Sequence, residues 1–187
     1  MKNFTTAILN KKNITDFAAS RNKLLKKSKA DWVLFLDKDE TILKEFKIET
    51  SDDFSCYQFI RKNYFLGQYF GNDKIIRLVK KGTGKWARCV HEVWKPSTGR
   101  VGMIDTPIIH NTADNLHEYI SKINFYSDLH AKANIEEGKR PTLLKIIFFP
   151  FGKFLITFFK TRNIVFSIMQ SLHSFLSWSK QWIIQNA

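Results

Sequence analysis

Acidic side chains follow directly after one apolar run of this sequence: Asp37, Asp39 and Glu40 come after residues 32–36. Carboxylate oxygens are the ligands that hard divalent cations such as Mg²⁺ or Mn²⁺ take, and these cations bridge to phosphates. Two aspartates one residue apart on an extended segment can both reach one cation if the chain bends there. The alternative is a solvated acidic turn that follows a strand and has no chemical role.

The element that must position these acids is the run Trp32-Val33-Leu34-Phe35-Leu36, whose composition is typical of a strand buried on both faces. Such a strand does not keep unpartnered carboxylates inside. We therefore expect the acids just past its C-terminal end, where ligands bind in open α/β sheets.

A helix is predicted before this strand. Thr15 or Asp16 can cap it, and it continues to about Lys29. Helix followed by strand is half of a βαβ unit. The strand that should precede the helix is missing or lies in the poorly patterned residues 1–13.

Basic residues can act at the same edge. Arg21 and Asn22 lie in the predicted helix, and a guanidinium placed there suits a diphosphate, although a surface arginine is the alternative. Arg77 lies inside a predicted strand at 75–80, where its charge requires a phosphate or a neighbouring carboxylate such as Asp73.

Two further segments end in residues that can do proton or metal chemistry. His91 and Glu92 follow a predicted strand at 86–90, and a glutamate near a metal-bound phosphate can act as a general base toward a hydroxyl. His91 can polarise that glutamate or contact phosphate. His110 follows another apolar run and can bind a metal through its imidazole. The alternative for the first segment is a polar strand terminus, and for His110 it is a hydrogen-bonded histidine at a strand end.

Positive charge is concentrated at the two ends of the chain. The 187 residues carry a formal net charge of +13, which indicates an anionic partner. Residues 1–30 hold eight Lys/Arg and one acid, and the segment after Glu137 holds seven Lys/Arg, ten Phe/Trp and no acid. Basic and aromatic residues together are typical of a membrane interface, and packing on a partner protein is the alternative.

Helices are predicted at about 114–134 and, after residue 143, as two or three pieces broken near Pro150 and Arg162-Asn163. No stretch offers about 20 uninterrupted apolar residues, so no transmembrane helix is predicted. The sequence lacks the P-loop, dinucleotide, nucleophile-elbow, zinc and nucleic-acid-binding motifs, and nucleic acid is not predicted as a partner. Cys56 and Cys89 indicate a reducing compartment, and no signal peptide is expected.

Taken in order, these motifs resemble family 2 glycosyltransferases, and within them the bacterial lipopolysaccharide-core and cell-envelope branch. The resemblance covers about residues 16–160 and is carried by residues 17–22, 31–40, 64–67, 76–78, 86 with 90–92, 107–110 and 119–127. It implies a GT-A fold, an α/β architecture with a mixed sheet.

The resemblance also implies a hexosyltransferase that moves a sugar from a nucleotide-diphosphate sugar, such as a UDP-sugar, to a lipid-linked or cell-envelope saccharide. Asp37 and Asp39 match the family's DxD metal motif, which holds Mg²⁺ or Mn²⁺ against the donor diphosphate. The predicted site residues are Glu92 and His91 for catalysis, Arg21, Asn22, Asp37 and Arg77 for donor binding, and Asp37, Asp39 and His110 for the metal.

Family members begin with a base-binding unit of about 60 residues or more, and residues 1–15 cannot supply it. We therefore expect a partial, N-terminally truncated transferase domain at 1–138 that lacks its first strands, with a partner supplying the missing half. The helical extension at 139–187 is expected on the anionic inner face of the cell membrane, on its cytoplasmic side. The alternative is a non-catalytic membrane-associated or partner-binding protein that retains a truncated transferase fold.

Overall fold

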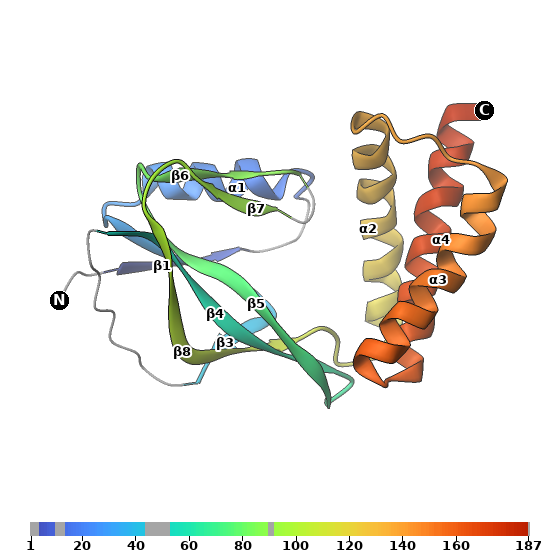
Figure 1. Ribbon diagram of the computed structural model, residues 1–187, viewed down its shortest axis with the longest axis horizontal. Coiled ribbons are helices and arrows are strands. Elements are labelled where there is room, and N and C mark those ends of the chain that lie inside the picture. Colours follow the sequence, from blue (N-terminus) through green and yellow to red (C-terminus); the bar gives the residue numbers. More distant parts are fainter. Residues whose placement is uncertain (1–3, 10–13, 44–52, 90–91, 187) are drawn as a thin grey trace. The chain divides into compact units, whose positions relative to one another are not determined.

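The computed structural model of the chain describes residues 4–9, 14–43, 53–89 and 92–186. It divides into two compact units (Figure 1). Unit 1 comprises residues 1–63 and 72–111, and unit 2 comprises residues 64–71 and 112–187. The boundary between the two compact units lies at residues 111–112. The predicted boundary between the transferase domain (1–138) and the helical extension (139–187) concerns function, and it stays a prediction.

A mixed β-sheet is the basis of unit 1. In the described residues this sheet has six strands in the order β1-β2-β5-β4-β8-β3, and β6 and β7 form a separate two-stranded sheet. β1 is parallel to β2, and the pairs β2/β5 and β3/β8 are antiparallel. The strands are β1 (Phe4–Leu9), β2 (Trp32–Asp37), β3 (Glu40–Ile42), β4 (Phe54–Phe65), β5 (Gln68–Lys80), β6 (Gly84–Ala87), β7 (Val93–Pro96) and β8 (Arg100–Asn111).

Strand β2 is buried on both faces, as its composition predicted. Val33 and Phe35 pack on one side with helix α1 (Phe17–Lys27) and the hairpin β6–β7, which lie together on that side of the sheet (Figure 1). Trp32 and Leu34 pack on the other side with residues of β4, β5 and β8. All four side chains are at most 3% exposed. The predicted α/β architecture is confirmed, and it is compatible with a glycosyltransferase fold.

Of the two alternatives for the strand before the helix, β1 confirms the second. This strand lies within the poorly patterned segment and pairs in parallel with β2 from Phe4↔Trp32 to Leu9↔Asp37. It is the edge strand of the sheet, and Leu9 is its buried residue. An edge strand with so little buried surface has no strong alternation of polar and apolar residues, so the hydrophobic pattern did not reveal it.

Helix α1 begins as the sequence predicted. Asp16 is its N-cap, and Oδ1 of Asp16 accepts a hydrogen bond of 2.8 Å from the backbone nitrogen of Ala19. Lys26 and Lys27 occupy the last turn, where positive charge is favourable to the helix dipole. The cap and the dipole together explain why these eleven residues form a helix.

Removal of the Asp16 cap tests its contribution to the stability of the fold, which is expected to be small. Asp16→Ala is expected to lower the free energy of unfolding by about 1 kcal/mol, because the backbone N–H of Ala19 loses its acceptor. Urea unfolding followed by circular dichroism measures the change. Lys23→Ala, at an exposed position of the same helix, is the control and should change stability by less than about 0.5 kcal/mol. Equal stability of the two variants would show that the cap contributes nothing.

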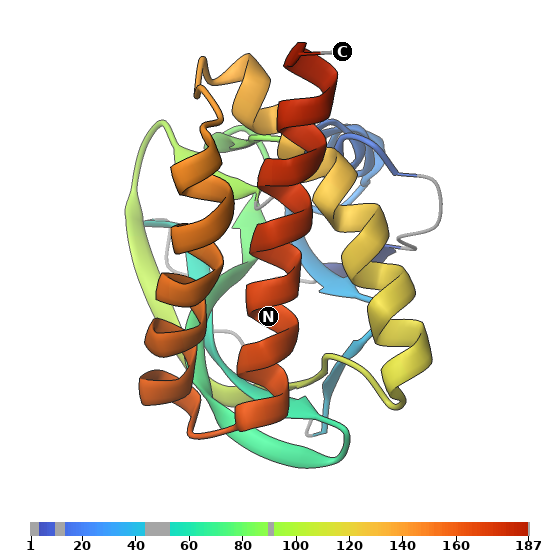
Figure 2. The same cartoon turned by 90° about the vertical axis from the view of Figure 1, so that its right-hand side faces the viewer.

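Unit 2 contains three helices in the described residues: α2 (Leu116–Glu136), α3 (Leu143–Thr161) and α4 (Ile164–Asn186). Helix α4 lies between α2 and α3 and packs against both (Figure 2). At the tip of the β4–β5 hairpin, Phe65 packs on Tyr119 of α2 and Phe166 of α4. The predicted helix at 114–134 is therefore confirmed to within two residues at each end.

The two predicted breaks in the C-terminal helices have different outcomes. The break at 162–163 is confirmed: Arg162 adopts a left-handed conformation with φ of 54°, and Oδ1 of Asn163 accepts from the backbone nitrogen of Phe166. The break near Pro150 is wrong, because α3 continues through it. Proline removes one backbone hydrogen bond, but Pro150 is buried and its carbonyl accepts from Ser171 of α4, so α3 is attached to α4 at this point. None of the described helices combines the length and the apolarity needed to cross a membrane.

Candidate functional site

The carboxyl end of β2 carries the predicted acidic residues. Asp37 is the last residue of β2, Asp39 lies in the turn that follows, and Glu40 begins β3. Because β3 pairs with β8, Glu40 is opposite His110. The backbone nitrogen of Asn111 also donates to the carbonyl of Asp39 at 3.0 Å. Sheet pairing therefore brings His110 to the predicted acids although it is about 70 residues away in sequence.

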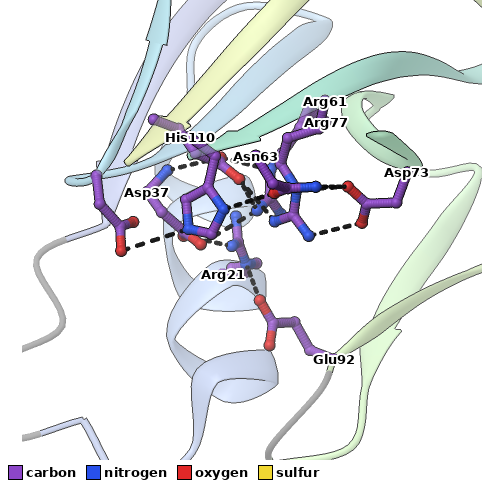
Figure 3. A network of polar contacts seen from close by, with 10 residues as sticks. Arg21, Asp37, Arg61, Asn63, Asp73, Arg77, Glu92 and His110 are labelled. Atoms are coloured by element: carbon purple, nitrogen blue, oxygen red, sulfur yellow. Dashed lines mark hydrogen bonds and ion pairs between the residues drawn. The ribbon is translucent and has the colours of Figure 1, made fainter. Parts of the chain in front are cut away.

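Arg21 joins two of the predicted site carboxylates. Its Nη2 donates to Oδ1 of Asp37 at 2.7 Å, and its Nε donates to Oε1 of Glu92 at 2.8 Å (Figure 3). The side chain is fully buried, with its Cζ 5.5 Å from the ring centre of Phe35 and 4.9 Å from that of Trp86. The first turns of α1 thus approach the end of β2, as expected. A contact of Arg21 with donor phosphates stays a prediction.

Arg77 holds the other side of the same carboxylates. Its Nη2 donates to Oδ2 of Asp37 at 3.1 Å and to Oε1 of Glu40 at 2.6 Å, and its Nε donates to Oε2 of Glu40 at 2.7 Å. The structure therefore gives Arg77 carboxylate partners, which was one of the two predicted kinds, although these are not Asp73. Asp73 pairs instead with Arg61, whose Nη2 lies 2.6 Å from Oδ2.

The oppositely charged groups of this network keep one another ionised. Burial alone would raise the pKa of Glu40, but the charge and hydrogen bonds of Arg77 outweigh it, so this pKa lies below its usual value. Burial alone would also raise the pKa of Asp73, but the hydrogen bonds that Asp73 accepts from Arg61 and Asn63 outweigh it, so this pKa is lowered as well. Burial would lower the pKa values of Arg77 and Arg61, but their carboxylate partners raise them. These four groups are therefore charged at neutral pH.

The lowered pKa of Asp73 predicts a pH dependence of stability. Its ionised form stabilises the fold above its ordinary pKa of 3.8, and this contribution is lost as the pH falls through 3.8 toward the lower folded value. The free energy of unfolding should therefore fall in acid, and it should fall less steeply for Asp73→Asn. Urea unfolding at a series of pH values measures the slope. The exposed Asp105→Asn is the control and should keep the wild-type slope; a wild-type slope for Asp73→Asn would contradict the prediction.

Asn63 fixes the proton of His110. Its Nδ2 donates to Oδ1 of Asp73 at 2.8 Å, and because a carboxylate only accepts, the amide orientation is determined. Oδ1 of Asn63 then faces Nδ1 of His110 at 2.8 Å, so Nδ1 carries the hydrogen (Figure 3). Neutral His110 consequently has its lone pair on Nε2, which lies 3.6 Å from Oδ2 of Asp39. Such a pair suits a cation, or an ion pair if His110 is protonated.

The divalent metal implied by the resemblance fits this geometry in part. Within the described ranges, no group of three or more His, Cys, Asp and Glu side chains is placed to hold a metal ion. Both oxygens of Asp37 accept from guanidinium groups, which suits a metal ligand poorly. Asp39 provides a carboxylate oxygen, the ligand type that suits Mg²⁺ and Mn²⁺, whereas the imidazole of His110 is of a type that suits other transition metals better. The metal role of all three residues stays a prediction.

The remaining predicted site residues lie as follows. Nδ2 of Asn22 donates to the carbonyl of Trp86 at 2.9 Å, and its Oδ1 accepts from the nitrogen of Trp86 at 3.0 Å. This amide therefore attaches β6 to α1, and its role in donor binding stays a prediction. His91 lies outside the described residues.

The network also contains residues that the sequence prediction did not assign to the site. Arg61 lies in β4 and Glu40 at the start of β3, and both are parts of buried or half-buried strands. A charge in such a strand requires a partner, which is the signal that could have found them. The additional residues are Glu40, Arg61, Asn63 and Asp73.

Comparison with known proteins supports the resemblance. No family model matches the chain. Over 158 residues it is 28% identical to the lipopolysaccharide core biosynthesis glycosyltransferase LpsC of Rhizobium meliloti, a match that covers 77% of this chain and 58% of that protein. It is 25% identical over 160 residues to an uncharacterized glycosyltransferase of Rickettsia bellii, covering 74% of this chain and 54% of that one. An uncharacterized glycosyltransferase of Rickettsia conorii is 24% identical, with coverages of 74% and 57%.

The fold and these relatives together define the class of the protein. The chain is a homologue of glycosyltransferases, and the comparisons support a glycosyltransferase family for it. It spans about half the length of the curated relatives that it matches, between 54% and 58%.

Proposed function

We propose that the chain carries the catalytic side of a glycosyltransferase. The proposed reaction moves a hexose from a nucleotide-diphosphate sugar, such as a UDP-sugar, to a lipid-linked or cell-envelope saccharide at the cytoplasmic face of the membrane. The observation that carries the proposal is Arg21, which joins Glu92 to Asp37 at the carboxyl end of β2. The Rhizobium meliloti relative is named for lipopolysaccharide core biosynthesis, which supports an envelope saccharide as acceptor.

Glu92 would accept the proton of the acceptor hydroxyl. As that oxygen forms its bond to the anomeric carbon, the bond from this carbon to the donor phosphate breaks, and the electron pair leaves with the nucleotide diphosphate. Oε1 of Glu92 is held by Arg21, which leaves Oε2 as the oxygen that takes the proton. Arg21 therefore orients the base through one oxygen.

Asp39 and His110 would hold Mg²⁺ or Mn²⁺ at this edge, and the ion would offset negative charge on the leaving diphosphate. Mg²⁺ keeps several water ligands and is commonly bound by one or two carboxylates together with substrate phosphates, so the carboxylate of Asp39 would be its main protein ligand. Asp37, held between Arg21 and Arg77, would position the turn that carries Asp39.

Donor binding and donor turnover test this proposal. Calorimetry of the chain with UDP-sugars is expected to show binding that depends on Mn²⁺, and Asp39→Asn should abolish it while Asp105→Asn keeps it. Release of UDP in the presence of an envelope saccharide measures turnover. The relatives are longer, so we propose a partner that supplies the remaining length, and the assay is repeated with it. Absence of donor binding in every case would favour a non-catalytic protein that retains the transferase fold.

A further inference from the structure

The most buried side chains of helices α3 and α4 are mostly small or polar, and many of their large apolar side chains are exposed. The buried residues of α4 are Ser167, Ser177 and Gln181, and those of α3 are Pro150 and Thr157. A helix that packs in water shows the reverse arrangement, with an apolar stripe facing its neighbours. Small and polar residues at helix contacts are characteristic of helices whose surroundings are apolar.

Five of the exposed apolar residues of α3 form one stripe. Leu144, Phe148, Phe151, Leu155 and Phe159 follow one another at intervals of three or four residues, so they share one side of the helix. Four of these five are 61% exposed or more, and Leu155 is 36% exposed. Large contiguous apolar patches on a protein surface mark sites of contact with proteins or membranes. The exposed large apolar residues of α3 are Leu143, Leu144, Ile147, Phe148, Phe149, Phe151, Leu155, Ile156 and Phe159.

The charge around this stripe favours one kind of contact. Residues 138–187 contain seven Lys/Arg and no Asp or Glu. Lys153 and Lys160 are exposed, and each lies four residues after an exposed apolar residue of α3, Phe149 and Ile156, at the edge of the exposed apolar surface. The stripe itself carries no hydrogen-bonding side chain, whereas protein interfaces regularly contain hydrogen bonds. An apolar helix face with lysines beside it is the arrangement of helices that lie in the surface of an anionic bilayer.

We propose that the exposed apolar surface of α3, with Lys153 and Lys160 at its edge, binds the surface of an anionic lipid bilayer. The helix would lie in the plane of the interface, with its aromatic side chains among the lipid chains and its lysines near the lipid phosphates. This inference rests on the membrane location in the proposed function and names the surface that makes the contact. Because it concerns a different unit of the chain and no sugar donor, vesicle binding and donor turnover can fail independently.

Co-sedimentation of the chain with lipid vesicles tests the proposal. We expect binding to vesicles of phosphatidylcholine mixed with phosphatidylglycerol, and weaker binding to phosphatidylcholine alone. The triple variant Phe148→Ser, Phe151→Ser and Leu155→Ser should lower the affinity at least about tenfold. The variant Lys153→Gln/Lys160→Gln should lower it about tenfold for the anionic vesicles only.

Matched controls and a second measurement decide the outcome. Val101→Ser/Met103→Ser removes exposed apolar residues of β8, and Lys26→Gln/Lys27→Gln removes exposed lysines of α1; both should bind as wild type. Far-ultraviolet circular dichroism checks that each variant keeps its helices. Failure of the wild-type chain to bind anionic vesicles overturns the proposal, as does wild-type binding by the triple variant. Sedimentation velocity that shows a dimer, lost in the triple variant, without vesicle binding would assign the stripe to a second copy instead.

Discussion

Glu92→Gln is expected to lower the rate of sugar transfer about 10²–10⁴-fold while donor binding stays close to wild type. Glutamine can still accept the hydrogen bond of 2.8 Å from Nε of Arg21 through its amide oxygen, so the local structure is kept. It cannot take a proton from the acceptor hydroxyl. Transfer at saturating donor measures the rate, and calorimetry measures donor affinity.

The control for Glu92→Gln is Glu118→Gln, an equal change at an exposed position in the first turn of α2. It should transfer sugar at the wild-type rate. A wild-type rate for Glu92→Gln would remove Glu92 from the reaction and leave it only as an ion-pair partner of Arg21.

Arg21→Leu is expected to lower the free energy of unfolding by about 3–5 kcal/mol. The substitution removes the guanidinium that bonds to both Glu92 and Asp37, while Arg77 still pairs with Asp37. Both carboxylates are then left in a site where their side chains are 14% and 10% exposed. Urea unfolding at neutral pH measures the change.

Two variants accompany Arg21→Leu. Arg100→Leu, at an exposed arginine in β8, should change stability by less than about 0.5 kcal/mol. Arg21→Lys keeps the charge, but an ammonium lacks the planar fork that reaches Asp37 and Glu92 together, so we expect a larger effect on transfer than on stability. If the free energy of unfolding of Arg21→Leu is within about 0.5 kcal/mol of the wild-type value, the ion pairs of Arg21 do not stabilise the fold.

The central strand and the place of the acids could be predicted because both are local properties. An unbroken apolar run gives β2, and the cost of burying unpaired charge places Asp37 and Asp39 at its end. The capped helix α1 follows from Asp16 and the residues after it. The βαβ arrangement then brings Arg21 to the same end of the sheet.

The partners within the network could not be predicted, because they depend on strand pairing over long distances in sequence. Arg77 bonds to Glu40, 37 residues away, and Arg61 bonds to Glu40, 21 residues away. Register decides these contacts, and a shift of one residue would turn each side chain to the opposite face. Likewise, the outward apolar face of α3 depends on how α4 packs, and the sequence of α3 shows only that it is rich in such residues.

The turn between β2 and β3 has little conformational freedom left. The backbone nitrogen of Asp37 donates to Oε2 of Glu40 at 3.1 Å, and Arg77 bonds to both side chains, so the two ends of the turn are tied together. Fixing the backbone of one residue costs about 1–2 kcal/mol of conformational entropy. Here that loss occurs during folding and not on binding. A ligand of Asp39 therefore meets a preorganised carboxylate, and its affinity is not reduced by the ordering of a loop.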